Sequence, residues 1–214
     1  MRSLLIAALS LSDLRLLPRR APAAILDPIV RALAAAGVTP NSISVAGVLG
    51  NAAGAALVAS GSLAAGGVVV ILASALDMLD GGLARATGRA TPFGGVLDST
   101  LDRISESVVL FGIAWYASAQ DLQTEALLAF VAVVGSLMVS YIRARVEAAG
   151  GSILDGVFTR PERVVVTGVA LVTGWLLVGL WILAVVSTLT AMQRLWLARA
   201  AVDSARPAVG PRKD

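Results

Sequence analysis

The chain has 214 residues, of which 57% are hydrophobic and 14% charged, with a net charge of +3 and a mean hydropathy of +0.83. This composition is too apolar for an ordinary soluble domain and is typical of a helical protein with several membrane spans. The chain contains no cysteine and no histidine, which excludes disulfides, thiolate or imidazole metal sites and a Ser-His-Asp triad. Acid–base chemistry must therefore fall to carboxylates, lysine, tyrosine or water.

The N-terminal region, residues 1–26, combines a short apolar run at 4–11 with Arg15, Arg19 and Arg20. The run is short for a span, and no convincing signal-peptide cleavage site precedes the arginines. We interpret this region as a cytoplasmic or surface-lying arm.

The next segment, residues 27–36, has apolar positions at helical spacing, which predicts an amphipathic helix lying in the membrane interface. Gly37 is expected to end this helix. Ser42 follows a turn and is expected to cap the next helix.

Six apolar stretches then predict six transmembrane helices, so the expected fold is an all-α, polytopic membrane protein. The first four are expected at about 43–59, 66–87, 93–119 and 124–149, and the last two share 163–200, with a turn near 174–179. We expect one membrane domain over 27–202 and a flexible polar tail over 203–214.

The basic residues are distributed unevenly along the chain. The turns after the first, third and fifth predicted spans contain no Lys or Arg. All 17 basic residues lie in the N-terminal region, around the second turn, around the fourth turn, or at and beyond the end of the sixth span. By the positive-inside rule, both termini and the second and fourth turns face the cytoplasm. The predicted location is the cell (plasma) membrane.

Glycines recur within the predicted spans, as at Gly47, Gly50 and Gly54 in the first. Small residues let helices approach closely in a membrane. We interpret these glycines as packing positions and not as part of any chemistry.

Four aspartates stand at helical spacings where the second and third predicted spans meet. Asp77 and Asp80 are three residues apart, and Asp98 and Asp102 are four apart, so each pair shares a helix face. Lone charges beside apolar spans are costly. Divalent cations would offset the repulsion between carboxylates, and hard cations such as Mg²⁺ prefer oxygen ligands.

These residues form the pattern D-G-x2-A-R-x8-G-x3-D-x3-D, which resembles the signature of the CDP-alcohol phosphotransferase family. The pattern matches at Asp80, Gly81, Ala84, Arg85, Gly94, Asp98 and Asp102, and Asp77 matches a further aspartate of the family. Seven fixed positions with both gaps matched form a specific signal. The resemblance covers nearly the whole chain apart from residues 1–26 and the tail.

The resemblance implies an integral membrane enzyme that transfers a phosphatidyl-type group from a CDP-lipid, such as CDP-diacylglycerol, to an alcohol and releases CMP. It implies that Asp77, Asp80, Asp98 and Asp102 bind two divalent ions, Mg²⁺ or alternatively Mn²⁺. It also implies that Asp102 deprotonates the acceptor hydroxyl. The implied CDP-lipid-binding residues are Pro40, Asn41, Ser42, Ile43, Gly81, Arg85 and Thr91.

A second polar group surrounds the fourth turn and bears on the choice of acceptor. It comprises Ser140, Arg143, Arg145, Arg160 and Arg163. Several guanidiniums beside the aspartates would suit an anionic acceptor, although membrane anchoring explains single arginines equally well. The stretch from Tyr141 to Glu147 is also similar to the branch of the family that makes phosphatidylinositol phosphate, which favours inositol phosphate.

Two alternatives remain open from the residues. Glycerol 3-phosphate is also anionic and would make the chain a phosphatidylglycerol phosphate synthase. A membrane transporter or cation-binding protein could use the same carboxylates, although such proteins place ionisable groups near the bilayer midplane.

Two further glutamates are interpreted as structural. Glu106 is expected to pair with Arg103 or with another helix, and Glu147 with Arg143 at a spacing of four residues. Nothing supports nucleic-acid binding. The family resemblance implies a homodimer.

Overall fold

The structure is a computed structural model that describes residues 23–153 and 158–205, and helices joined by short turns and loops make up this part of the chain. The helices are α2 (Ala23–Ala35), α3 (Pro40–Ala59), α4 (Leu63–Asp77), α5 (Asp80–Ala86), α6 (Pro92–Ala119), α7 (Gln123–Ala148), α8 (Arg160–Thr173) and α9 (Leu176–Ala205). The all-α prediction is confirmed. Most of the predicted N-terminal arm (residues 1–22) and of the tail (206–214) lies outside the described residues.

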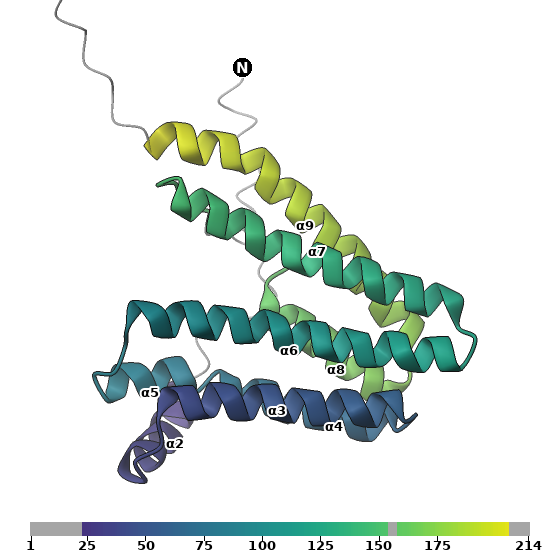
Figure 1. Cartoon of the computed structure of the whole chain (residues 1–214), viewed down its shortest axis with the longest axis horizontal. Helices are drawn as coiled ribbons and strands as arrows, with labels where there is room; N and C mark the ends of the chain where they lie inside the picture. Colours follow the sequence, from purple (N-terminus) through teal and green to yellow (C-terminus); the bar gives the residue numbers. More distant parts are fainter. Residues whose placement is uncertain (1–22, 154–157, 206–214) are drawn as a thin grey trace, which may run out of the picture.

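The long helices run side by side as a bundle, and α2 crosses one end of it next to α5 (Figure 1). The interior is an apolar cluster shared by α3, α4, α6, α7, α8 and α9. A Cβ added at Gly50 would lie 2.7 Å from Cβ of Ala73, and one at Gly54 would lie 2.7 Å from Cγ2 of Val70. For Gly50 and Gly54, the prediction of close helix packing is therefore confirmed.

Threonine residues cap the start of α3, α6 and α8. Thr39 caps α3 by accepting a hydrogen bond from the backbone N–H of Ser42 at 3.2 Å. Thr91 caps α6 in the same way, accepting from Gly94 N–H at 3.0 Å. The prediction that Ser42 is the cap was wrong, because Pro40, which needs no hydrogen bond for its nitrogen, already occupies the first helical turn.

The second predicted span is interrupted between its two aspartates. Helix α4 ends at Asp77 and α5 begins at Asp80, with Met78 and Leu79 in a turn. Both turn residues keep φ and ψ close to helical values (−65° and −14°, −84° and −22°), so the chain continues in the same general direction. The interruption precedes Gly81 and Gly82, which are poor helix formers.

Among the residues that the structure describes, four helical segments are long and apolar enough to cross a membrane: Pro40–Ala59, Leu63–Ala86, Gln123–Ala148 and Leu176–Ser204. Helix α8 has 14 residues, a length of about 21 Å against a hydrocarbon core of about 30 Å. A left-handed Gly174 (φ 77°) ends it, which confirms the turn expected near 174–179. The structure thus shows a multi-helix membrane architecture, with four of the six predicted spans meeting these criteria.

Candidate active site

The four aspartates of the sequence pattern converge at one end of the bundle. Asp77 ends α4, Asp80 begins α5, and both are buried, whereas the half-buried Asp98 and Asp102 come from α6. The carboxyl groups of Asp77 and Asp102 are close enough to interact directly, and so are those of Asp80 and Asp98. Aspartates from three helices therefore form one cluster, as the spacing predicted.

Arg160, the first residue of α8, bridges two members of this cluster. Its Nη2 donates a hydrogen bond to Oδ2 of Asp77 at 2.6 Å, and its Nη1 lies 2.6 Å from Oδ1 of Asp102. The second contact is an ion pair without hydrogen-bond geometry. The side chain of Arg160 is 22% exposed, so its charge acts in a partly dehydrated setting where electrostatic attraction is strong.

Asp80 is held by two donors. The hydroxyl of Ser44 on α3 donates to Oδ2 of Asp80 at 2.5 Å, and the backbone N–H of Gly81 donates to the other oxygen. Ser44 lies one residue beyond the predicted 40–43 stretch and was not predicted. Its signal was a small polar residue at the start of an apolar span. Its hydrogen bond brings the start of α3 next to the start of α5.

Gly47 allows α3 to pass close to Asp77. A Cβ added at Gly47 would lie 2.9 Å from Oδ1 of Asp77. This oxygen is buried and has no hydrogen-bond partner, so one lone-pair face of Asp77 is unsatisfied by the protein. Burial of an unpartnered carboxylate oxygen is costly.

The donor set fits a divalent cation in chemical type. Four carboxylates supply hard oxygens, which Mg²⁺ and Mn²⁺ prefer. Oδ1 of Asp77 has no hydrogen-bond partner and could bind a cation. Within the described ranges, no three or more acidic side chains are already arranged to hold a metal ion. The guanidinium of Arg160 instead takes up oxygens of Asp77 and Asp102.

The residues predicted to bind the CDP-lipid lie around the same end of the bundle. Gly81 and Arg85 are neighbours, because a Cβ added at Gly81 would lie 3.5 Å from Nη1 of Arg85. Pro40, Asn41 and Ser42 form the first turn of α3, and Thr91 caps α6. Ile43 instead packs into a small apolar cluster with Val30, Leu79 and Leu83, so its side chain serves the fold.

The predicted acceptor residues separate into different environments. Arg163 is buried and forms an ion pair with Glu106. Arg143 pairs with Glu147 on its own helix at 2.8 Å, and Arg145 is exposed. Ser140 is half-buried on α7. Arg160 alone among these residues is shown in an ion pair with the aspartate cluster. Both predicted glutamate pairings are confirmed, Glu106 with another helix and Glu147 with Arg143.

Arg194 on α9 is a buried arginine that sequence reasoning did not select. Its Nη1 donates to the backbone carbonyl of Val139 at 2.8 Å, next to Ser140 on α7. The sequence indicated only that Arg194 lies near the end of the last span, where arginines commonly anchor a helix. Its burial depends on packing between α7 and α9, which no local pattern reveals.

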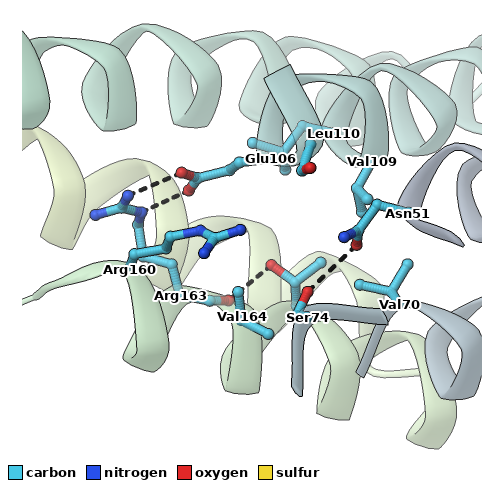
Figure 2. Close-up of a pocket in the computed structure, with 11 residues that line it drawn as sticks. Asn51, Val70, Ser74, Glu106, Val109, Leu110, Arg160, Arg163 and Val164 are labelled. Atoms are coloured by element: carbon cyan, nitrogen blue, oxygen red, sulfur yellow. Dashed lines mark hydrogen bonds and ion pairs between the residues drawn. The ribbon is translucent and has the colours of Figure 1, made fainter. Parts of the chain in front are cut away.

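A small cavity lined by both polar and apolar side chains lies next to the cluster, between α3, α4, α6 and α8 (Figure 2). Its volume is about 20 Å³, room for about one water molecule. Polar side chains line it: Asn51, Ser74, Ser105, Glu106, Arg160, Arg163 and Thr167. Figure 2 shows Glu106 reaching toward the arginines of α8, and Ser74 hydrogen-bonded to Asn51.

The part of the sequence that contains this cluster matches a known protein family. The family model described as CDP-alcohol phosphatidyltransferase matches residues 37–199. This chain belongs to the CDP-alcohol phosphatidyltransferase family. The matched region contains α3 to α8 and most of α9, and hence the whole aspartate cluster. The transporter alternative is therefore not retained, since members of this family are enzymes.

Within the family, the chain is 40% identical over 207 residues to phosphatidylinositol phosphate synthase of Mycobacterium tuberculosis, covering 90% of this chain and 95% of that protein. Two crystal structures of that synthase are similar at 36% identity. The one with CDP-DAG bound has a TM-score of 0.77 and covers 86% of this chain and 98% of that chain. The one in complex with manganese and citrate has a TM-score of 0.76, with 85% and 92% covered.

Proposed function

We propose that this enzyme transfers the phosphatidyl group of CDP-diacylglycerol to inositol phosphate and releases CMP. The observation that carries the proposal is the convergence of Asp77, Asp80, Asp98 and Asp102 with Arg160, in a chain 40% identical to a phosphatidylinositol phosphate synthase. Carboxylates suit the cations that a diphosphate requires, and a guanidinium suits a phosphate-bearing acceptor.

The aspartate cluster is the metal site in this proposal. Asp77, Asp80, Asp98 and Asp102 hold two divalent ions, Mg²⁺ or Mn²⁺, and a related synthase has been crystallised in complex with manganese. Such ions neutralise the diphosphate and acidify a bound hydroxyl. Ser44 and Gly81 orient Asp80 for this task through their hydrogen bonds.

Asp102 is the base that removes the proton of the acceptor hydroxyl. The acceptor oxygen then forms a bond to the phosphorus of the phosphatidyl group, the phosphorus–oxygen bond to CMP breaks, and CMP leaves. Asp102 suits this role because it is half-buried and lies on α6, where substrate can reach it more easily than the buried Asp77 and Asp80. A base must lie within hydrogen-bonding reach of the proton it takes.

The substrates occupy different parts of the site. The nucleotide is surrounded by residues at the start of α3, in α5 and at the start of α6. These residues are Pro40, Asn41, Ser42, Gly81, Arg85 and Thr91. Arg160 contacts the acceptor phosphate, with Ser140, Arg143, Arg145 and Arg163 contributing positive charge or polar contacts from α7 and α8. The acceptor part is the less direct assignment, because Arg143 and Arg163 already have carboxylate partners.

In the membrane, we place α3, α4 with α5, α6, α7, α8 and α9 as six spans and α2 as the interfacial helix. The buried Val30 and the exposed Asp27 and Arg31 give α2 one apolar and one charged side. The arginines near the aspartate cluster support a site at the cytoplasmic face of the plasma membrane. The protein acts as a homodimer in this proposal.

The decisive experiment is an acceptor competition assay with purified protein, CDP-diacylglycerol and Mg²⁺ or Mn²⁺, with CMP release and lipid product measured. We expect CMP release with inositol phosphate, formation of phosphatidylinositol phosphate, and loss of both with EDTA. Preference for glycerol 3-phosphate, serine or free inositol would overturn the acceptor assignment. Undiminished transfer in EDTA would overturn the metal assignment.

A further inference from the structure

Arg160 binds the oxygens that the proposed metal site needs. Its two terminal nitrogens each lie 2.6 Å from a carboxylate oxygen, one on Asp77 and one on Asp102. A guanidinium in contact with both oxygens would face a divalent charge at close range if the same oxygens coordinated an ion. Like charges at such a distance in a partly buried site repel strongly, so the two modes of neutralisation compete.

A single arginine also neutralises the cluster incompletely. Four carboxylates interact in pairs, and Arg160 supplies one positive charge to two of them. Oδ1 of Asp77 stays without a hydrogen-bond partner although it is buried. Arg160 thus holds Asp77 and Asp102 together but leaves Oδ1 of Asp77 without a partner. A cation of higher charge would neutralise these carboxylates more completely.

The Nε atom of the Arg160 guanidinium is not fixed by a hydrogen bond. Its Nε is buried and has no hydrogen-bond partner, and neither has the hydroxyl of Ser105. Both residues line the small cavity beside the cluster, which has room for about one water molecule. The base of the side chain is anchored, because Thr159 and Glu162 form a capping box around the first turn of α8.

We propose that Arg160 is an exchangeable counter-ion. It holds Asp77 and Asp102 until these carboxylates bind divalent cations, and it then turns its guanidinium to the phosphate of the acceptor. This inference rests on the proposed function. It assigns Arg160 a positioning role in assembling the site in addition to its contact with the acceptor. Because binding couplings are reciprocal, the acceptor should also strengthen cation binding through Arg160.

The test measures Mn²⁺ binding by electron paramagnetic resonance in detergent-solubilised protein without lipid substrate. Arg160→Gln should bind Mn²⁺ at least about tenfold more tightly than the unmodified protein, within the usual range of site couplings. Inositol phosphate should raise Mn²⁺ affinity in the unmodified protein and not in the variant. Arg89→Gln is the control for net charge, because Arg89 is exposed in the turn between α5 and α6.

The outcomes separate this inference from the proposed function. Unchanged or weaker Mn²⁺ binding in Arg160→Gln, or an equal gain in Arg89→Gln, overturns the exchange, and an equal effect of inositol phosphate in both proteins overturns the transfer to acceptor. Absence of Mn²⁺ binding in every protein overturns the metal site itself. Arg160→Lys, which keeps one charge but cannot fork across two carboxylates, should show intermediate affinity and serves if the glutamine variant does not fold.

Discussion

Arg163 of α8 and Glu106 of α6 form a two-point ion pair, with Nε 2.5 Å from Oε1 and Nη2 2.8 Å from Oε2. Nη1 of Arg163 also reaches the backbone carbonyl of Phe158 at 3.3 Å. This pair fixes α8 to α6 one helical turn away from Arg160. The position of Arg160 over Asp77 and Asp102 therefore depends on it.

Glu106→Gln should destabilise the protein by about 3 kcal/mol, because it leaves the charge of Arg163 buried without its partner. The measurement is the free energy of unfolding in mixed micelles. The matched control is Glu147→Gln, which breaks the exposed pair with Arg143 and should cost less than about 1 kcal/mol. Combining Glu106→Gln with Arg163→Met should recover part of the loss. Equal stability of the two single variants would show that the buried pair is unimportant.

Asp102→Asn should lower transfer by about 10³-fold, because the amide cannot take the acceptor proton. Binding of CDP-diacylglycerol should be largely preserved. The measurements are CMP release and a ligand-binding isotherm on the same preparation. The control is Asp121→Asn in the turn after α6, where the backbone φ of 57° suits asparagine as well as aspartate. Full activity of Asp102→Asn would refute its role as base.

Ser44→Ala should weaken metal affinity by about tenfold, because it removes the donor that orients the Asp80 carboxylate. The measurement is the concentration of Mg²⁺ or Mn²⁺ that gives half-maximal CMP release. Ser60→Ala is the control, since Ser60 bonds only locally to the carbonyl of Leu57 at the far end of α3. A metal requirement that is identical in both variants would argue against a positioning role for Ser44.

Gly47→Ala should impair activity more than folding. The added methyl group would lie 2.9 Å from Oδ1 of Asp77, so either that carboxylate or α3 must shift. We expect a loss of at least about tenfold in CMP release, since small displacements at a reacting centre have large effects. In Gly95→Ala the methyl group meets nothing within 4 Å, and near-normal activity is expected. Equal activity of the two variants would contradict the close approach.

The aspartate cluster could be predicted because its signal is local. Residues three and four apart share a helix face, and the short connection between the two spans brings their ends together. The roles of the arginines could not be predicted in the same way. Arg160 and Arg163 are three residues apart on one helix, yet one meets Asp77 and Asp102 and the other meets Glu106. That division depends on how α8 packs between α4 and α6.

The fold followed the hydrophobic pattern closely, and the differences arose where local chemistry competes with it. The cap at Thr39 instead of Ser42 reflects the proline that follows the threonine. The interruption at Met78 and Leu79 divides an apolar run that reads as one helix. Ser44 and Arg194 were missed because each gains its importance from a partner on another helix.

The turn at Met78 and Leu79 also governs how far apart Asp77 and Asp80 can stand. In an unbroken helix, the pitch sets the separation of residues three apart. Here that separation is set by the backbone torsions of two turn residues, Met78 and Leu79. The distance between the two carboxylates is thus not bound to the value that a continuous helix would impose.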